Sequence, residues 1–151
     1  MNTIEIVKVN TKNYHLYCDM IHKRIKGRER NLDEKLETKI KHSKRIEEEL
    51  SNPNFYVYAA EYNKKFIGWI HGVYIPKIGK WTEGILFLDE IWVDPDYRNQ
   101  GVGEMLMLKM KEIKKVMKVK KLRLYTDNQT AKTFFEKCGI KTVCQCHFME
   151  D

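Results

Sequence analysis

The spacing of the apolar residues changes twice along this chain, and these changes restrict the folds that it can adopt. From residue 11 to residue 50 the apolar side chains recur mostly every three or four positions, as on one face of a helix. From 55 to 93 they alternate or run together, as in strands, and helical spacing returns at residue 102. We therefore expect an α/β (α+β) fold with a mixed, mostly antiparallel sheet and about four helices, and not a doubly wound parallel sheet.

The expected elements follow the order β-α-α-β-β-β-α-β-α-β. Strands are predicted at residues 3–9, 55–62, 66–75, 85–93, 121–126 and 140–148. Helices are predicted at about 11–26, 31–50, 101–117 and 128–138. Thr11 is the expected cap of the first helix and Gly27 its end, and Asn31 with Glu34 resembles a capping box that begins the second. The expected apolar stripe of that second helix is Leu32, Leu36, Ile40, Ile46 and Leu50.

Length and composition favour one globular domain over residues 1–151. The chain has 151 residues, of which 42% are hydrophobic and 32% charged, so disorder is excluded. No run approaches the ~20 apolar residues of a membrane span, and the first residues do not resemble a secretory signal, which favours the cytoplasm. The four cysteines show no metal-ligand spacing and are expected to be buried or half-buried structural thiols, without a metal.

The positive charge of the chain is concentrated in one segment. The formal net charge is +7, and residues 105–123 hold eight basic residues against one acidic residue. The remainder is therefore neutral. A basic segment attracts an anion, which leaves nucleic acid, a membrane surface or a phosphate-bearing ligand open, next to the simpler interpretation of a solvated helix face.

The segment 93–103 has the features of a phosphate-binding turn. A strand ends there, Gly101 and Gly103 allow close approach of a ligand to the backbone, and a helix begins with its free N–H groups. Arg98 adds a cation. The stretch has neither the Gly-Lys-Ser/Thr of a P-loop nor the third glycine of a dinucleotide fingerprint, so both of those classes are excluded.

Two stretches resemble the signatures of the GNAT (GCN5-related N-acetyltransferase) superfamily. Arg98-x-x-Gly101-x-Gly103 is similar to its acetyl-CoA pyrophosphate motif, and the stretch 88–98 is similar to the central strand that leads into that loop. The stretch 128–140, in which Asn128 precedes a helix and a Glu-Lys-x-Gly sequence, is similar to the second signature. The resemblance implies transfer of an acetyl group from acetyl-CoA, as co-substrate, to a primary amine.

The resemblance also assigns the residues that would hold acetyl-CoA. The pantetheine arm would pair like a strand with the backbone around Ile91, Trp92 and Val93, and Asn128 would contact it. The pyrophosphate would lie on the turn formed by Arg98, Asn99, Gln100, Gly101, Val102 and Gly103. One or two lysines of the basic segment would meet the ribose 3′-phosphate.

Catalysis requires a group that takes a proton from the amine, because an alkylamine is charged at pH 7. Asp89 and Glu90 lie where several relatives carry an acid on the central strand. As successive strand residues they point to opposite faces unless a bulge intervenes. Glu90 would then share a face with Leu88 and Trp92, and Asp89 with Ile91, so the choice between the two carboxylates stays open.

The group that protonates the leaving thiolate is also open. Many relatives place a tyrosine on the second-signature helix, but the matching residue is Phe135, which has no proton to donate and is expected only among the residues that hold acetyl-CoA. The alternatives are Tyr125, Tyr97, Tyr74 or Cys138, or departure of the thiolate without a protein acid. Tyr125 is our choice among them.

The sequence limits the acceptor amine to a chemical class and does not identify the compound. The resemblance places its site near residues 14–27, Trp69, His71, Tyr74 and Trp81, and is compatible with a polyamine-like or aminoglycoside-like amine or a peptide N-terminus. A non-catalytic CoA-binding domain is the main alternative. A nucleic-acid-binding protein is the weaker one, since its recognition motifs are missing, and no membrane partner is expected. A homodimer through the C-terminal strands is the oligomer that the resemblance suggests.

Overall fold

A mixed sheet forms the centre of the molecule. The computed structural model describes residues 3–40, 43–80, 83–147 and 149–151, and within them five strands pair in the order β1-β2-β3-β4-β5. The pairs β1-β2, β2-β3 and β3-β4 are antiparallel, and the pair β4-β5 is parallel. This pairing confirms the mixed, mostly antiparallel sheet. The strands are β1 (Glu5–Lys8), β2 (Phe55–Tyr62), β3 (Lys65–Ile75), β4 (Ile85–Val93) and β5 (Lys121–Arg123).

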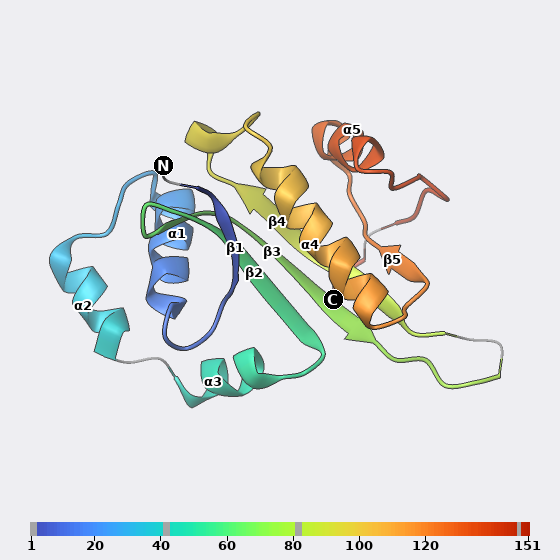
Figure 1. Ribbon diagram of the computed structural model, residues 1–151, viewed down its shortest axis with the longest axis horizontal. Helices are drawn as coiled ribbons and strands as arrows, with labels where there is room; N and C mark the ends of the chain where they lie inside the picture. Colours follow the sequence, from blue (N-terminus) through green and yellow to red (C-terminus); the bar gives the residue numbers. More distant parts are fainter. Residues whose placement is uncertain (1–2, 41–42, 81–82, 148) are drawn as a thin grey trace.

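Helices cover both faces of this sheet (Figure 1). The described residues form α1 (Tyr14–Lys26), α2 (Leu32–Ile40), α3 (Lys44–Ser51), α4 (Val102–Val116) and α5 (Gln129–Lys137), with a short 3₁₀ turn, η1 (Pro95–Tyr97). On one face α4 and α5 share a hydrophobic core with Ile70 and Leu86. On the other face α1 packs through Met20 against Val57 and Trp69. The sheet thus separates two cores, and its α1 face differs chemically from its α4 face.

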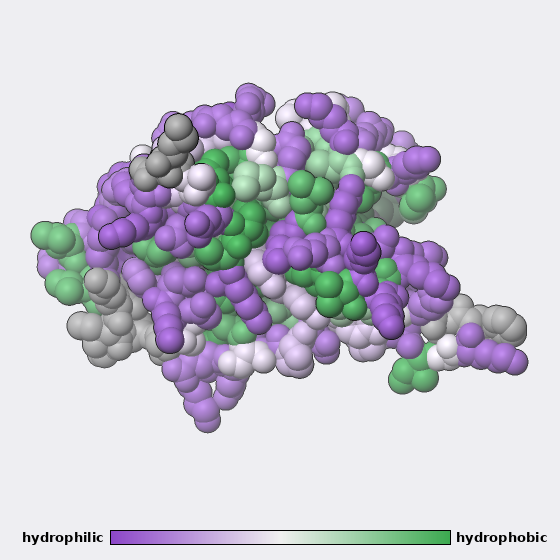
Figure 2. Space-filling model, in the orientation of Figure 1, coloured by the Kyte–Doolittle hydropathy of each residue, from purple (hydrophilic) through white to green (hydrophobic). Residues whose placement is uncertain are grey.

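Helix α4 agrees closely with its sequence pattern. The apolar residues at spacings of four, four and three are all buried against the sheet: Val102, Leu106, Met110 and Ile113. Burial of this stripe stabilises the helix more than backbone propensity does, since a 15-residue helix is marginal alone. Its outward side carries the lysines, and Figure 2 shows mostly hydrophilic side chains over this part of the surface.

The caps predicted around the first two helices are present, with one correction. Gly27 adopts a left-handed φ of 68° and its N–H bonds back to Lys23, which ends α1. Asn31 and Glu34 exchange backbone-to-side-chain hydrogen bonds of 2.8 and 2.9 Å, as a capping box does. Thr11 is not the cap of α1; the helix begins at Tyr14.

The single helix predicted at 31–50 is wrong, because the described residues there form two helices. Helix α2 ends at Ile40, and Ser43 starts α3 by accepting a hydrogen bond from the N–H of Ile46. The apolar spacing already breaks at this point, since Ile46 follows Ile40 by six positions rather than three or four. The first part of the stripe does not reach the core either: Leu32 and Leu36 are exposed, whereas Leu50 packs against the core on the α1 side of the sheet. The division raises the number of α-helices in the described residues from about four to five.

The prediction of a final strand at 140–148 is also wrong over its described part. Residues 140–147 have no regular secondary structure, and residue 148 lies outside the described residues. Alternating side chains favour a strand only when a neighbouring strand supplies hydrogen bonds, and β5 is itself only three residues long rather than 121–126. Without burial by a sheet, Cys144 and Cys146 are exposed, contrary to expectation, whereas Cys18 and Cys138 are half-buried as expected.

The capping box makes the start of α2 sensitive to acid. Hydrogen bonds from Arg28, and then from the Asn31 N–H, lower the pKa of Glu34 to about 2. A lowered carboxyl pKa stabilises the fold above the unfolded-state value of about 4.3 and loses this effect as pH falls toward 2. We expect Glu34→Gln, which keeps the cap but not the charge, to be less stable than wild type at pH 5 and equally stable near pH 2 in urea unfolding. A difference that stays constant over this range would contradict the assignment.

Candidate active site

Strand β4 carries an extra residue at Asp89. His71 of β3 faces Glu90, and the next residue, Gly72, faces Leu88, so Asp89 has no partner on β3. This is a β-bulge, and it reverses the alternation of side chains along the strand. Leu88, before the bulge, packs on the α4 side, and so does Ile91 after it.

The bulge brings Asp89 and Glu90 to the same face. The Nε2 atom of His71 lies 2.6 Å from the Oδ2 atom of Asp89. Glu90 accepts a hydrogen bond from the Nη1 atom of Arg24, on α1. The expected sharing of a face between Glu90 and Leu88 is therefore wrong, because a simple two-residue alternation does not survive an inserted residue. Both carboxylates face α1, and both are accessible to solvent.

Aromatic side chains line the space around Glu90. The rings of Trp69 and Tyr17 meet edge to face at 5.4 Å, and the Trp69 ring lies 5.1 Å from that of His71. The Arg24 guanidinium lies 6.0 Å from the centre of the Trp69 ring and 5.8 Å from that of Trp92. Burial, and then the nearby Glu90 charge, raise the pKa of Tyr17 to about 12, so its hydroxyl keeps its proton at neutral pH. The site thus combines two carboxylates with aromatic surfaces, which suits a cation.

The turn before α4 has the backbone of a phosphate-binding loop. Asn99 and Gly101 both have positive φ, 58° and 81°, and Arg98 donates from Nε to the Val93 carbonyl at 3.0 Å. A Cβ on Gly101 would meet nothing within 4 Å, so this side of the turn is open. Gly103 also has a packing role: a Cβ there would lie 3.0 Å from Phe134, so its small size lets α5 pack against α4.

One edge of β4 is open next to this turn. The parallel pairing with β5 covers only Ile85 to Phe87, and among the described residues no other strand pairs on that side of β4. Residues 91–93 therefore have an edge to which an extended ligand can add. Asn128 caps α5, with its side-chain oxygen accepting from the Ala131 N–H at 3.0 Å, which leaves its amide NH₂ available.

The four alternative proton donors are divided by the sheet. Tyr97 and Cys138 pack on the α4-side core, and Tyr74 faces Leu86 of that core across the strands. Burial also raises the pKa of the Cys138 thiol. Tyr125 is instead exposed, and its ring lies 5.5 Å from the ring of Phe87. Phe87 comes two residues before Asp89 on β4.

Phe135 and Trp81 are the remaining predicted site residues. Phe135 is buried in the α4-side core, in contact with the ring of Phe134. Its side chain contributes to packing between α5 and α4. Trp81 lies outside the described residues.

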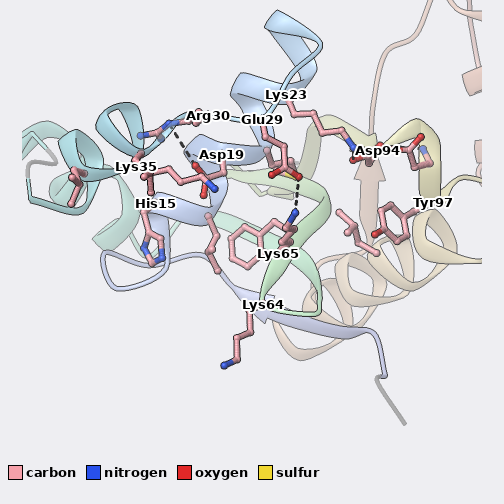
Figure 3. Close-up of a pocket in the computed structure, with 17 residues that line it drawn as sticks. His15, Asp19, Lys23, Glu29, Arg30, Lys35, Lys64, Lys65, Asp94 and Tyr97 are labelled. Carbon is pink, nitrogen blue, oxygen red and sulfur yellow. Dashed lines mark hydrogen bonds and ion pairs between the residues drawn. The ribbon is translucent and has the colours of Figure 1, made fainter.

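A separate cavity of about 540 Å³ lies on another side of α1 (Figure 3). Lys23 reaches across its edge to Asp94 at 2.6 Å and to Asp96 at 2.9 Å, and Glu29 pairs with Lys65. Asp94 is 5% exposed, and its side chain also accepts from the Asp96 N–H. These hydrogen bonds raise the pKa of Lys23. The pair thus ties α1 to the turn that leads into the Gly101 turn, a link that sequence spacing does not reveal.

Most of the basic segment 105–123 lies away from the Gly101 turn that precedes α4. Lys111, Lys114, Lys115 and Lys118 surround a hollow at the far end of α4. At about 1.5 Å per helical residue, Lys111 is roughly 15 Å along α4 from Gly101. Lys111 itself donates to the Cys138 carbonyl oxygen. The segment is therefore separate from the turn expected to hold the pyrophosphate.

Comparison with known proteins identifies the family. The fold and the glycine turn define an acetyltransferase-like protein, and a model of the acetyltransferase (GNAT) family matches residues 21–140. That range is well over half of the chain, which therefore belongs to the GNAT acetyltransferase family. No curated protein matches the sequence. Among the described residues, no helix has the length and apolar character needed to cross a membrane.

Solved structures of the same fold cover nearly the whole chain. The aminoglycoside N-acetyltransferase AAC(6′)-Iy in complex with CoA has a TM-score of 0.76 at 15% identity, covering 100% of this chain and 96% of that one. An aminoglycoside acetyltransferase from an uncultured soil metagenomic sample, in complex with sisomicin, has a TM-score of 0.73 at 15% identity and covers 98% and 97%. A transcriptional regulator from Bacillus halodurans C-125 has a TM-score of 0.77 at 18% identity and covers 99% and 100%. At these identities the likeness confirms the GNAT fold.

The link between α1 and the turn can be tested by removing one charge. Asp94→Asn keeps a side chain that caps η1 but removes the buried partner of Lys23. We expect it to lower the free energy of unfolding by about 1–3 kcal/mol, measured by urea denaturation. Asp96→Asn is the matched control, because Asp96 is exposed and its pairing with Lys23 is screened by water. Equal effects of the two substitutions would contradict the role of Asp94.

Proposed function

We propose that this chain transfers the acetyl group of acetyl-CoA to a primary amine, by direct attack within a ternary complex. The observation that carries the proposal is the bulge at Asp89, which places two accessible carboxylates on one face of β4. The same strand has an open edge that leads to the glycine turn. One strand therefore offers both a place for an extended thioester and a place for a cationic amine.

The open edge and the turn fit acetyl-CoA as co-substrate. The pantetheine arm would pair with the backbone of Ile91, Trp92 and Val93, and the amide of Asn128 would donate to it. The pyrophosphate would accept hydrogen bonds from the N–H groups of residues 99–103, at the start of α4. The open space at Gly101 supports this approach, and Arg98 supplies a positive charge beside it.

The reaction removes two protons from the bound ammonium and supplies one to sulfur. The ammonium gives its first proton to a carboxylate, and the neutral amine nitrogen then attacks the acetyl carbonyl carbon. A C–N bond forms, the nitrogen releases its second proton to solvent, the C–S bond breaks, and the thiolate leaves with the electron pair. A backbone N–H of β4 would stabilise the oxyanion between these steps. We assign Tyr125 as the donor that returns a proton to sulfur, because it lies beside the face of Asp89.

Asp89 is the better proton acceptor of the two carboxylates. Glu90 is already engaged by the Arg24 guanidinium. Among the described residues, Asp89 is bonded only to His71, and because an ionised carboxylate can only accept, Nε2 of His71 donates in that bond. The bond orients the Asp89 side chain, and its exposed surface leaves room for the amine. Glu90 and the aromatic side chains would then attract the cationic acceptor.

The acceptor that suits this site is a small, positively charged amine. Two solved relatives are aminoglycoside acetyltransferases, one bound to a CoA–acetylneamine bisubstrate analogue and one to sisomicin. The acidic and aromatic lining around Glu90 supports a polyamine-like or aminoglycoside-like acceptor here as well, ahead of a peptide N-terminus.

The assignment can be tested with an acetyl-CoA consumption screen over polyamines, aminoglycosides, amino acids and peptide N-termini. With any amine that is turned over, we expect Asp89→Asn to lower kcat by about 10²–10⁴-fold, the usual contribution of acid–base catalysis. Glu90→Gln should raise KM more than it lowers kcat, because it removes a charge that attracts the amine. Tyr125→Phe should lower kcat with little change in KM.

The screen also separates the alternatives. Binding of CoA without turnover of any amine would identify a non-catalytic member of the family. Unchanged rates in both carboxylate variants would exclude the proposed proton acceptor.

A pair of glycines tests the pyrophosphate turn. Gly101 and Gly27 both have a left-handed φ, of 81° and 68°, and both have open space where a Cβ would lie. Substitution by alanine should therefore cost each about 1 kcal/mol of stability. Only Gly101→Ala should also weaken acetyl-CoA binding, by about tenfold or 1.4 kcal/mol, in isothermal titration calorimetry. Equal affinity for acetyl-CoA in the two variants would place the pyrophosphate elsewhere.

A further inference from the structure

The guanidinium of Arg24 is held by groups that form a binding site for a cation. Glu90 pairs with it, and the rings of Trp69 and Trp92 lie 6.0 and 5.8 Å away. We call Glu90, Trp69 and Trp92 the cation cage. A carboxylate with aromatic faces at this distance attracts any ammonium or guanidinium group, because ring quadrupole and charge act together.

Arg24 is attached in a way that lets its side chain leave. It lies in the last turn of α1, three residues before the left-handed Gly27 that ends the helix. Its side chain is 37% exposed at the end of α1, whereas Met20, one turn earlier on the same face, enters the core. The two indoles instead belong to β3 and β4 and are fixed by the sheet.

We propose that the cation cage is a binding site for an ammonium group of the acceptor, and that Arg24 fills it until a polycationic amine displaces it. This proposal rests on the proposed function for the identity of the acceptor. The amine that reacts would lie at Asp89, next to Glu90 on the same face, while a second ammonium of the same molecule enters the cage.

The consequence is selection by charge number. An amine with a single charge can occupy the position at Asp89 but has no second charge with which to replace Arg24. A diamine or an amino sugar with several amines gains the cage contacts as well. Arg24 would therefore be a specificity-determining residue. Its side chain lowers the apparent affinity of the cage for cations, because a ligand binds only to the fraction of molecules in which the cage is empty.

The experiment measures cation binding to the protein without acetyl-CoA, with 1,4-diaminobutane as the probe and 1-aminobutane at equal ionic strength as its single-charge counterpart. Tryptophan fluorescence and the indole N–H signals of Trp69 and Trp92 report on the cage. We expect Arg24→Ala to bind 1,4-diaminobutane about tenfold more tightly than wild type, since no side chain has to be displaced first. Methylguanidinium should bind to Arg24→Ala and shift the same two indole signals.

Two variants control for charge and for folding. Arg45→Ala removes the same charge from an exposed pair with Glu49 on α3 and should bind the probe as wild type does. Arg24→Ala with Glu90→Gln should lose the gain. Arg24→Gln, which keeps a long side chain, serves if the alanine variant is unstable. With any acceptor that is turned over, Arg24→Gln should lower KM for amines with two or more charges and leave KM for monoamines unchanged.

The outcomes separate this inference from the proposed function. The cation cage would be overturned if wild type and both Arg24 variants bound the probe equally. It would also be overturned if the gain in affinity persisted with Glu90→Gln or appeared with Arg45→Ala. None of these results would contradict acetyl transfer. Tighter probe binding in a protein that turns over no amine would support the cage and contradict the proposed function.

Discussion

The extra residue in β4 determines which groups meet on each side of the sheet. Without the bulge at Asp89, Glu90 would continue the row of Leu88 into the core under α4, where a carboxylate without a partner is costly. With it, Ile91 takes that place and Glu90 turns to Arg24. One inserted residue thus keeps the core apolar and assembles the acidic side of the candidate site. The arrangement of His71, Trp92 and α1 around the carboxylates depends on it.

Strand β4 is held at its carboxyl end and is only partly paired along its outer side. At its carboxyl end, buried Asp94 fixes the turn to Lys23 of α1, so the helix that carries Arg24 and the loop that leads to Gly101 share one anchor. On its outer side β5 pairs with only three residues and leaves the rest of the edge open. A rigid strand with one free edge is well suited to hold two reactants in a fixed relation, which is the main requirement of a direct transfer.

Sequence reasoning was most reliable where a local pattern has one physical solution. The spacing of Val102, Leu106 and Met110 fixed α4, and the two motifs led to the correct family. It failed where the outcome depends on partners distant in the sequence. The segment 140–147 alternates like a strand, but no strand of the described part of the chain pairs with it, and Asp89 becomes a bulge only through its register with β3. The contact of Arg24 with two tryptophans likewise follows from tertiary packing alone.

The distribution of charge follows from this division of the sheet. The surplus lysines lie on the outer side and far end of α4, whereas the carboxylates Asp89 and Glu90 lie on the α1 face. Charges on opposite faces, separated by more than about 10 Å, are largely screened from one another at physiological salt. The basic surface therefore does not repel a cationic amine from the acidic face. A chain with a net charge of +7 can in this way present a locally acidic site to a positively charged acceptor.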